Sequence, residues 1–85
     1  MPYRFDPREL VIHLTIHAIH RGILRHISEA EINDLVHSGA RRMEPGTGDR
    51  GGEIWIFIKN IKGRRLAAVA EILHPHCYVI TVKNV

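Results

Sequence analysis

Histidine and arginine recur at four-residue steps near the start of the chain. His17, Arg21 and Arg25 follow this spacing, so on a helix their side chains would lie along one edge. Like charges at this spacing repel one another, and the edge makes physical sense if a phosphate or carboxylate lies against it. The alternative is that each arginine pairs with an acid, for example Glu29 or Glu53. The spacing therefore predicts either an anion-binding edge or two internal ion pairs.

A second basic cluster surrounds the predicted turn at residues 62–63. It consists of Lys59, Lys62, Arg64 and Arg65. Arginine makes two-pronged contacts with phosphate, so the cluster could bind RNA. Charge also protects edge strands and turns from pairing with other chains, and the two interpretations carry equal weight. On the last predicted strand, Thr81 and Lys83 alternate with Val82 and are expected to face the side opposite to Val82, Tyr78 and Ile80.

Histidine spacing also raises the question of a zinc site. Spacings of three and four would put His13, His17 and either His20 or Arg21 on one side of a helix. The remaining histidines and Cys77 lie far along the chain, so further ligands are not evident and we expect no metal and no cofactor. For His13 and His20 we favour half-buried rings with satisfied nitrogens. Cys77 lies in an apolar segment and is expected to be buried and inert.

Length and composition favour one small globular domain spanning residues 1–85. The chain is 45% apolar and 25% charged, which is ordinary for a folded domain. We find no membrane-spanning run and no secretory signal, and the single cysteine fits a cytoplasmic protein. The net charge is +3. Residues 50–85 hold six basic and two acidic side chains, or +4, which suits a polyanion such as RNA or an acidic protein partner.

Two helices are predicted in the first half of the chain. Asp6 can cap a first helix that runs to about Leu24. Alternatively, the β-branched residues of segment 10–14 leave it extended, and Thr15 caps a shorter helix. Residues 16–24 are helical in both cases. A second helix begins at the capping box formed by Ser28 and Glu31. One apolar stripe follows, made of Ile32, Leu35 and Val36, and the helix ends at Gly39.

Turn signals divide the second half into strands. The predicted strands are 53–61, 64–73 and 77–83, with a weaker candidate at 40–44. The loop 45–52 has four glycines in eight residues but lacks the Lys-Ser/Thr ending of a phosphate-binding loop, so we assign it no nucleotide role. The order predicts an α+β fold. Two N-terminal helices would pack on a three- to four-stranded antiparallel sheet.

The helix motif is similar to that of a known family. The string His17-Ala18-x-x-Arg21-x-x-x-Arg25-x-Ile27-Ser28 resembles the opening signature of a large bacterial family, domain-of-unknown-function family 4258. The later stretches Gly-Arg-Arg-Leu-Ala-Ala-Val and Val-Ile-Thr-Val look like its central and final strands. The resemblance covers about residues 13–83. That family is grouped by resemblance with the RelE and BrnT toxins, within the barnase, EndoU, colicin and RelE fold.

The resemblance implies a RelE-like fold and metal-independent RNA cleavage, with RNA on a translating ribosome among the substrates and an antitoxin protein as partner. The residues carried over by position are His17, Arg21, Arg25, one of Arg64 or Arg65, and Thr81. Lys83 stands where the family has an aromatic residue. The implied reaction is attack of a ribose 2′-hydroxyl on its own phosphate, with His17 as acid or base, the arginines on the phosphate and Thr81 as a hydrogen-bond donor. The alternative is an inactive fold that binds RNA or protein.

Overall fold

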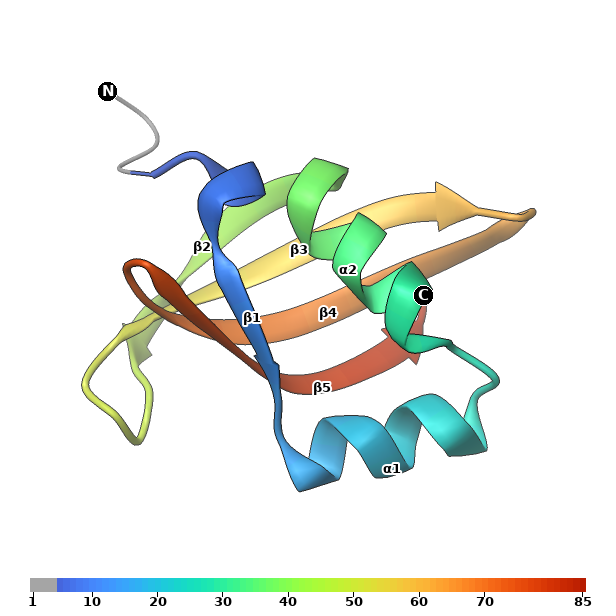
Figure 1. Ribbon diagram of the computed structural model, residues 1–85, viewed down its shortest axis with the longest axis horizontal. Helices are drawn as coiled ribbons and strands as arrows, with labels where there is room; N and C mark the ends of the chain where they lie inside the picture. Colours follow the sequence, from blue (N-terminus) through green and yellow to red (C-terminus); the bar gives the residue numbers. More distant parts are fainter. Residues whose placement is uncertain (1–4) are drawn as a thin grey trace.

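A five-stranded mixed sheet forms the centre of the computed structural model (Figure 1). The structure describes residues 5–85. The elements in chain order are the 3-10 helix η1 (Pro7–Glu9), β1 (Val11–Leu14), α1 (Ile16–Leu24), α2 (Glu29–Ser38), β2 (Ala40–Thr47), β3 (Glu53–Ile61), β4 (Arg64–Leu73) and β5 (His76–Asn84). The strand order is β1-β5-β4-β3-β2, in which β1 runs parallel to β5 and all other neighbours are antiparallel.

The predicted fold, two N-terminal helices on a three- to four-stranded antiparallel RelE-like sheet, is therefore wrong. A strand, β1, precedes both helices, and the sheet is larger and mixed. The reason lies at Thr15, whose hydroxyl accepts a hydrogen bond from the backbone N–H of Ala18 and caps α1. The helix consequently begins at Ile16, and Val11–Leu14 stays extended and pairs with β5. Asp6 caps only the three-residue η1.

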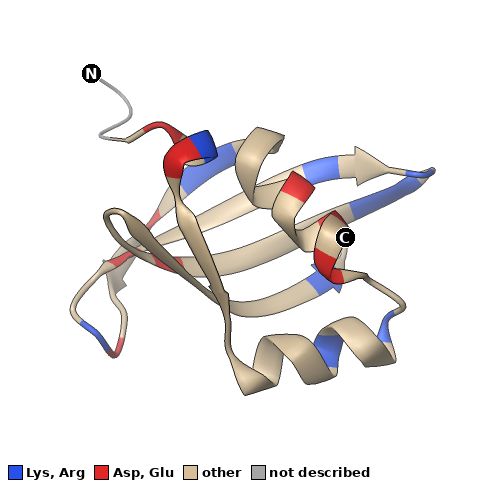
Figure 2. Cartoon of the chain, in the orientation of Figure 1, with Lys and Arg blue, Asp and Glu red and all other residues tan. Residues whose placement is uncertain are grey.

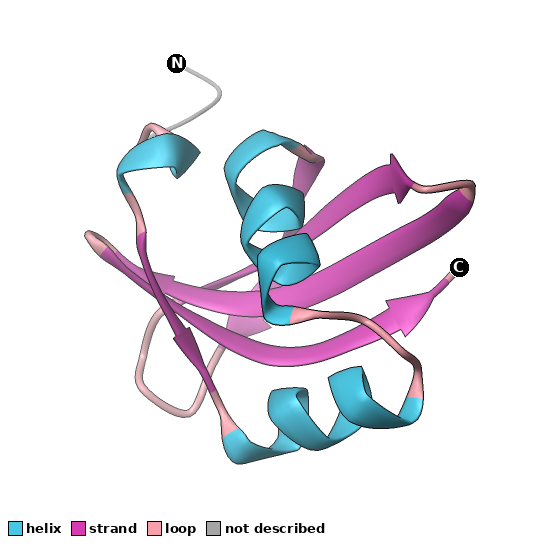
Figure 3. Cartoon of the chain, turned by 45° about the vertical axis from the view of Figure 1, so that its right-hand side comes forward, coloured by secondary structure: helices cyan, strands magenta, loops and turns pink. Residues whose placement is uncertain are grey.

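The hydrophobic core lies between the sheet and α2 (Figure 3). The predicted stripe is confirmed, because Ile32, Leu35 and Val36 are all buried. Both hydrogen bonds of the Ser28–Glu31 capping box are present, and α2 ends at Gly39 as expected. Burying each large aliphatic side chain stabilises the fold by about 1.5–3 kcal/mol. Local capping and core burial thus act together to place α2 across the sheet.

The second face of the sheet points away from α2, and we call it the far face. Strand alternation and register assign to it Ile54, Ile56, Ile58, Ala67, Val69, Glu71, Tyr78, Thr81 and Lys83. A bulge in β5 sets this pattern, since Val69 pairs with Thr81 but Ala70 pairs with Val79. The extra residue, Ile80, changes the alternation. Tyr78 therefore shares a face with Thr81, and the expectation that these two side chains point to opposite sides is wrong.

Two elements cover the edge of β5 that does not pair with β4. β1 pairs with its first half, and α1 continues along the rest (Figure 1). The Thr15 hydroxyl donates to the carbonyl of Val79 at 2.8 Å. Ala18 and Gly22 are buried on the contacting side of α1, where small side chains permit close approach. Neither helix of the described residues is long and apolar enough to cross a membrane.

Candidate functional site

Two residues of the predicted cationic edge lie together on α1. His17 is in the first turn, and Arg21 is one turn later. Arg21 Nε donates to His17 Nε2 at 3.4 Å. Because an arginine N–H can only donate, Nε2 must keep its lone pair, and the neutral ring carries its hydrogen on Nδ1. His17 is exposed, and its Nε2 lone pair is occupied by the hydrogen bond from Arg21.

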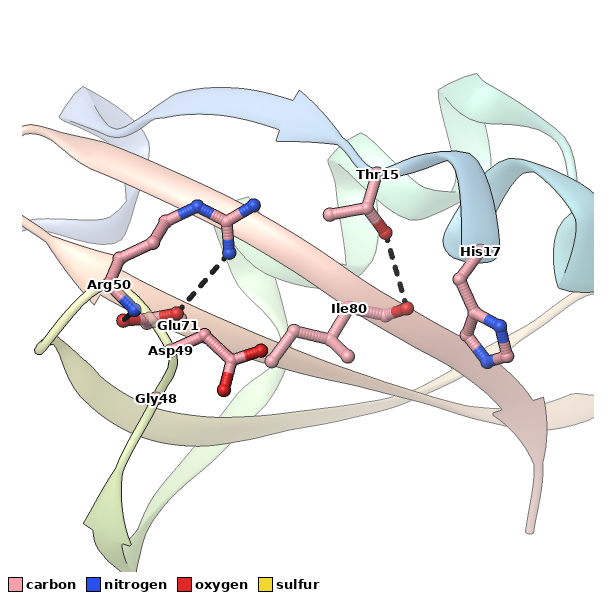
Figure 4. A pocket seen from close by; sticks show the side chains of 7 residues that line it. All are labelled: Thr15, His17, Gly48, Asp49, Arg50, Glu71 and Ile80. Atoms are coloured by element: carbon pink, nitrogen blue, oxygen red, sulfur yellow. Dashed lines mark hydrogen bonds and ion pairs between the residues drawn. The ribbon is translucent and has the colours of Figure 1, made fainter.

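An open cavity of about 270 Å³ lies beside His17 (Figure 4). Its lining residues are Thr15, His17, Gly48, Asp49, Arg50, Glu71 and Ile80. Glu71 belongs to the far face, so the cavity places His17 on that side of the sheet. In Figure 4, Asp49 and His17 lie on opposite sides of Ile80, and Arg50 closes the end away from α1. A histidine, a free carboxyl group and a guanidinium thus share one solvent-accessible hollow.

The buried carboxylate of Glu71 anchors the wall of this cavity. Its side chain is 0% exposed, and its Oε2 accepts the backbone N–H groups of Gly52 at 2.7 Å and Arg50 at 2.9 Å. Arg50 Nη1 adds an ion pair at 3.3 Å. A Cβ at Gly48 would come within 2.2 Å of the Glu71 carboxyl carbon. The glycines therefore let the β2–β3 loop fold onto a buried acid.

Arg25 and Arg64 are engaged within the protein. Arg25 Nη1 donates to the carbonyl of Val82 at 2.7 Å, at the edge of β5. Arg64 lies on the α2 side of β4 and forms an ion pair with Glu31 at 3.1 Å. Its guanidinium also donates to the carbonyls of Arg25 and His26, which end α1. Arg64 therefore caps a helix and is turned away from the far face, unlike His17.

The predicted RNA-binding cluster lies on β3, β4, the turn between them and the end of β5 (Figure 2), and the strand register divides its side chains between the two faces. Lys59 lies on the α2 side, where its ammonium group contacts Asp34 at 2.8 Å. Register places Arg65 and Lys83 on the far face, and both are exposed. Lys62 is exposed in the turn between β3 and β4. Only part of the cluster is thus directed to the side of His17.

Three of the residues that line the cavity were not expected from the sequence. They are Asp49, Arg50 and Glu71. One signal could have identified them, because Glu71 is a charged residue inside the apolar strand β4 and a buried carboxylate needs hydrogen-bond donors. The glycine-rich loop 45–52 can supply such donors because its backbone can approach closely.

The other candidate residues have simpler positions. Thr81 is half-buried on the far face. Cys77 is buried as expected, and this burial raises the pKa of its thiol to about 12. His13 lies in β1 and not on α1, so the predicted common side of His13, His17 and either His20 or Arg21 is wrong. His13 is half-buried as expected, whereas His20 is exposed. The helix that would have aligned these histidines begins only at Ile16.

Comparison of the chain with protein-family models, with curated proteins and with solved structures found no match.

Proposed function

We propose that the protein is a metal-independent endoribonuclease whose reaction centre is the cavity beside His17. The supporting observation is the arrangement of this cavity, in which an exposed imidazole is hydrogen-bonded to Arg21 through Nε2 and shares the hollow with Asp49 and Arg50. RNA cleavage through the 2′-hydroxyl needs a proton acceptor, a proton donor and cations near the phosphate. A proton acceptor and cations are present on one side of the sheet.

His17 Nε2 would accept the proton of the ribose 2′-hydroxyl once the guanidinium of Arg21 moves from this nitrogen to the phosphate. The 2′-oxygen then attacks the adjacent phosphorus, and the bond to the 5′-oxygen breaks. The departing 5′-oxygen would take up a proton from water in the open cavity. Arg21 and Arg50 would donate to the phosphate oxygens as negative charge builds up. The products would carry a 2′,3′-cyclic phosphate and a free 5′-hydroxyl.

The proposal leaves out Arg25 and Arg64, which were expected from the sequence, because both are engaged within the protein. It brings in Arg50 from the loop 45–52, for which the sequence predicted no nucleotide role. Arg50 is paired with Glu71, but its side chain is 42% exposed and lines the cavity.

Thr81 lies on the far face but does not line the cavity, so its expected role as a donor stays a prediction. RNA on either side of the reacting linkage would extend toward Arg65 and Lys83.

The test is cleavage of a fluorescent RNA hairpin by tag-free protein in EDTA. We expect His17→Ala to lower the rate by about two to four orders of magnitude, because it removes the proton acceptor. Arg21→Ala should lower it by about 10²–10³. His20→Ala is the matched control, since His20 is exposed on the same helix but does not line the cavity. Equal cleavage by wild type and His17→Ala would reject the proposal.

A second candidate function is RNA binding without cleavage. The contacts of Arg25 and Arg64 within the protein favour this candidate, because they leave less positive charge to stabilise the phosphate in the transition state of cleavage. In that case wild type would bind RNA but leave it intact. Arg65→Ala and Lys83→Ala would each weaken binding. Each substitution would also make the slope of log K against log salt concentration shallower by about one phosphate contact. Binding that is insensitive to both changes would reject this candidate.

A further inference from the structure

Two histidines from distant parts of the sequence meet on the far face at the edge of the sheet. His13 belongs to β1 and His76 begins β5. In the parallel register Val11 pairs with His76 and His13 pairs with Tyr78. His13 and His76 therefore lie on the same face of the sheet, on neighbouring strands. His13 Nε2 and His76 Nδ1 are 3.0 Å apart. At this separation the two nitrogens share one hydrogen, with one ring as donor and the other as acceptor.

Neighbouring groups orient this pair without blocking it. The His13 ring stacks on Tyr78 with a centroid distance of 4.9 Å and an interplanar angle of 18°. The guanidinium of Arg50 lies 4.4 Å from the centre of the Tyr78 ring, and its charge is balanced by Glu71. His13 is half-buried and His76 is exposed. Tyr78 therefore holds the His13 ring in place, while the exposed His76 ring is held by its contact with His13.

We propose that His13 and His76 form a two-histidine chelate for a divalent transition-metal ion of the Ni²⁺, Cu²⁺ and Zn²⁺ group. Such ions bind neutral imidazole nitrogens at about 2.0–2.1 Å. Two ligands at right angles on one ion are then about 2.9 Å apart, close to the separation of 3.0 Å found between these nitrogens. The ring that donates the shared hydrogen would change tautomer, so that its hydrogen moves through solvent to its other ring nitrogen. After rotation of the rings, both facing lone pairs would then bind the ion.

The coordination would be completed by water. Residues 5–85 contain no group of three or more His, Cys, Asp or Glu side chains placed to hold a metal ion, so the protein supplies two ligands. The consequence is structural, because the ion would join the four-residue strand β1 to β5. This inference does not depend on RNA cleavage, and His13 and His76 do not line the cavity beside His17.

The experiment is thermal unfolding of tag-free protein at pH 7.5 with and without NiCl₂ or ZnCl₂. We expect the ions to raise the Tm of wild type and of the control His20→Gln by several degrees, since binding to the folded state stabilises it. His13→Gln and His76→Gln should lose most of this rise. MgCl₂ should have no effect, and the rise should disappear at pH 5.5 because protons compete for the imidazoles. No rise in wild type, or an equal rise in both variants, would overturn the proposal.

A second measurement uses wild type alone, so it tests the chelate even if the histidine variants fail to fold. Paramagnetic Ni²⁺ broadens the NMR signals of the rings that bind it. We expect the ring signals of His13 and His76 to broaden at lower Ni²⁺ concentration than those of the other five histidines. Uniform broadening of all seven, or first broadening at another histidine, would contradict the chelate.

Discussion

Replacing Glu71 tests whether one buried carboxylate holds the β2–β3 loop against the sheet. The carboxylate accepts two backbone N–H groups and one side-chain group, and Gly52 is itself buried. Glu71→Ala would leave these donors without a partner. Leaving a buried donor without a partner costs about 1–3 kcal/mol, and each hydrogen bond to a charged group contributes about 1.5–3 kcal/mol. We therefore expect Glu71→Ala to lower the free energy of unfolding by about 3–5 kcal/mol.

Glu71→Gln separates the contributions. Both backbone donors, at Arg50 and Gly52, use the same oxygen, Oε2, and a glutamine carbonyl can replace it. The change removes only the ion pair with Arg50, whose side chain is 42% exposed. Ion pairs that face solvent contribute about 0–1 kcal/mol. We expect Glu71→Gln to cost about 1 kcal/mol, well below the cost of alanine.

Urea unfolding followed by the fluorescence of the buried Trp55 gives both values. Hydrogen exchange then locates the effect. The amides of Arg50 and Gly52 should lose protection in Glu71→Ala and keep most of it in Glu71→Gln. If alanine costs less than about 1 kcal/mol and both amides stay protected, the carboxylate does not anchor the loop, and our account of the cavity wall is wrong.

Three further outcomes are expected. Because burial raises the pKa of the Cys77 thiol to about 12, iodoacetamide at pH 8 should label unfolded protein but not folded protein, and rapid labelling of the folded form would contradict this. The backbone N–H of Ser28 holds the pKa of Glu31 below its usual 4.5, so the charged form stabilises the fold above pH 4.5 and this contribution is lost as pH falls through the lowered value. Urea titrations at pH 6 and pH 3 should therefore show a smaller loss for Glu31→Gln than for wild type, and equal losses would refute it. Arg25→Ala should cost about 1–3 kcal/mol because it unpairs the carbonyl of Val82, whereas an unchanged urea midpoint would show that Arg25 is available to ligands.

Features set by neighbouring residues could be predicted from the sequence. The capping box at Ser28, the stripe of α2 and the stop at Gly39 each depend on residues within about three turns. β3 follows from its β-branched and aromatic residues, whereas periodicity left β4 ambiguous between helix and strand, and the turn before it and the His74-Pro75-His76 break after it favoured a strand. Such signals are local, so no knowledge of the tertiary fold is needed to read them.

The sheet could not be predicted in full because its edge depends on distant pairing. β1 has four residues and is stabilised by β5, more than sixty residues away, through parallel pairing that leaves no hairpin signal. The bulge at Ile80 is equally hidden, since it is defined by the register with β4. One extra residue then reverses the side that every later residue of the strand faces.

The candidate site shows the same division. The contact of His17 with Arg21 depends on helical spacing and was expected. The partners of Arg25 and Arg64 are a strand-edge carbonyl and the capping residue Glu31, and spacing alone cannot distinguish these from a phosphate. The cavity also needs the loop that Glu71 attracts, so its composition follows from a tertiary contact.

The most direct test of the central claim uses an oligonucleotide that is DNA except for one ribonucleotide. If His17 serves a reaction at the 2′-hydroxyl, wild-type protein in EDTA should cut only after that ribose and leave a 2′,3′-cyclic phosphate, which mass spectrometry identifies. A 2′-O-methyl group at the same position should abolish the cut. Cleavage of the 2′-O-methyl strand would contradict the account. The account would also be contradicted if the protein cut neither the single-ribose strand nor unmodified RNA.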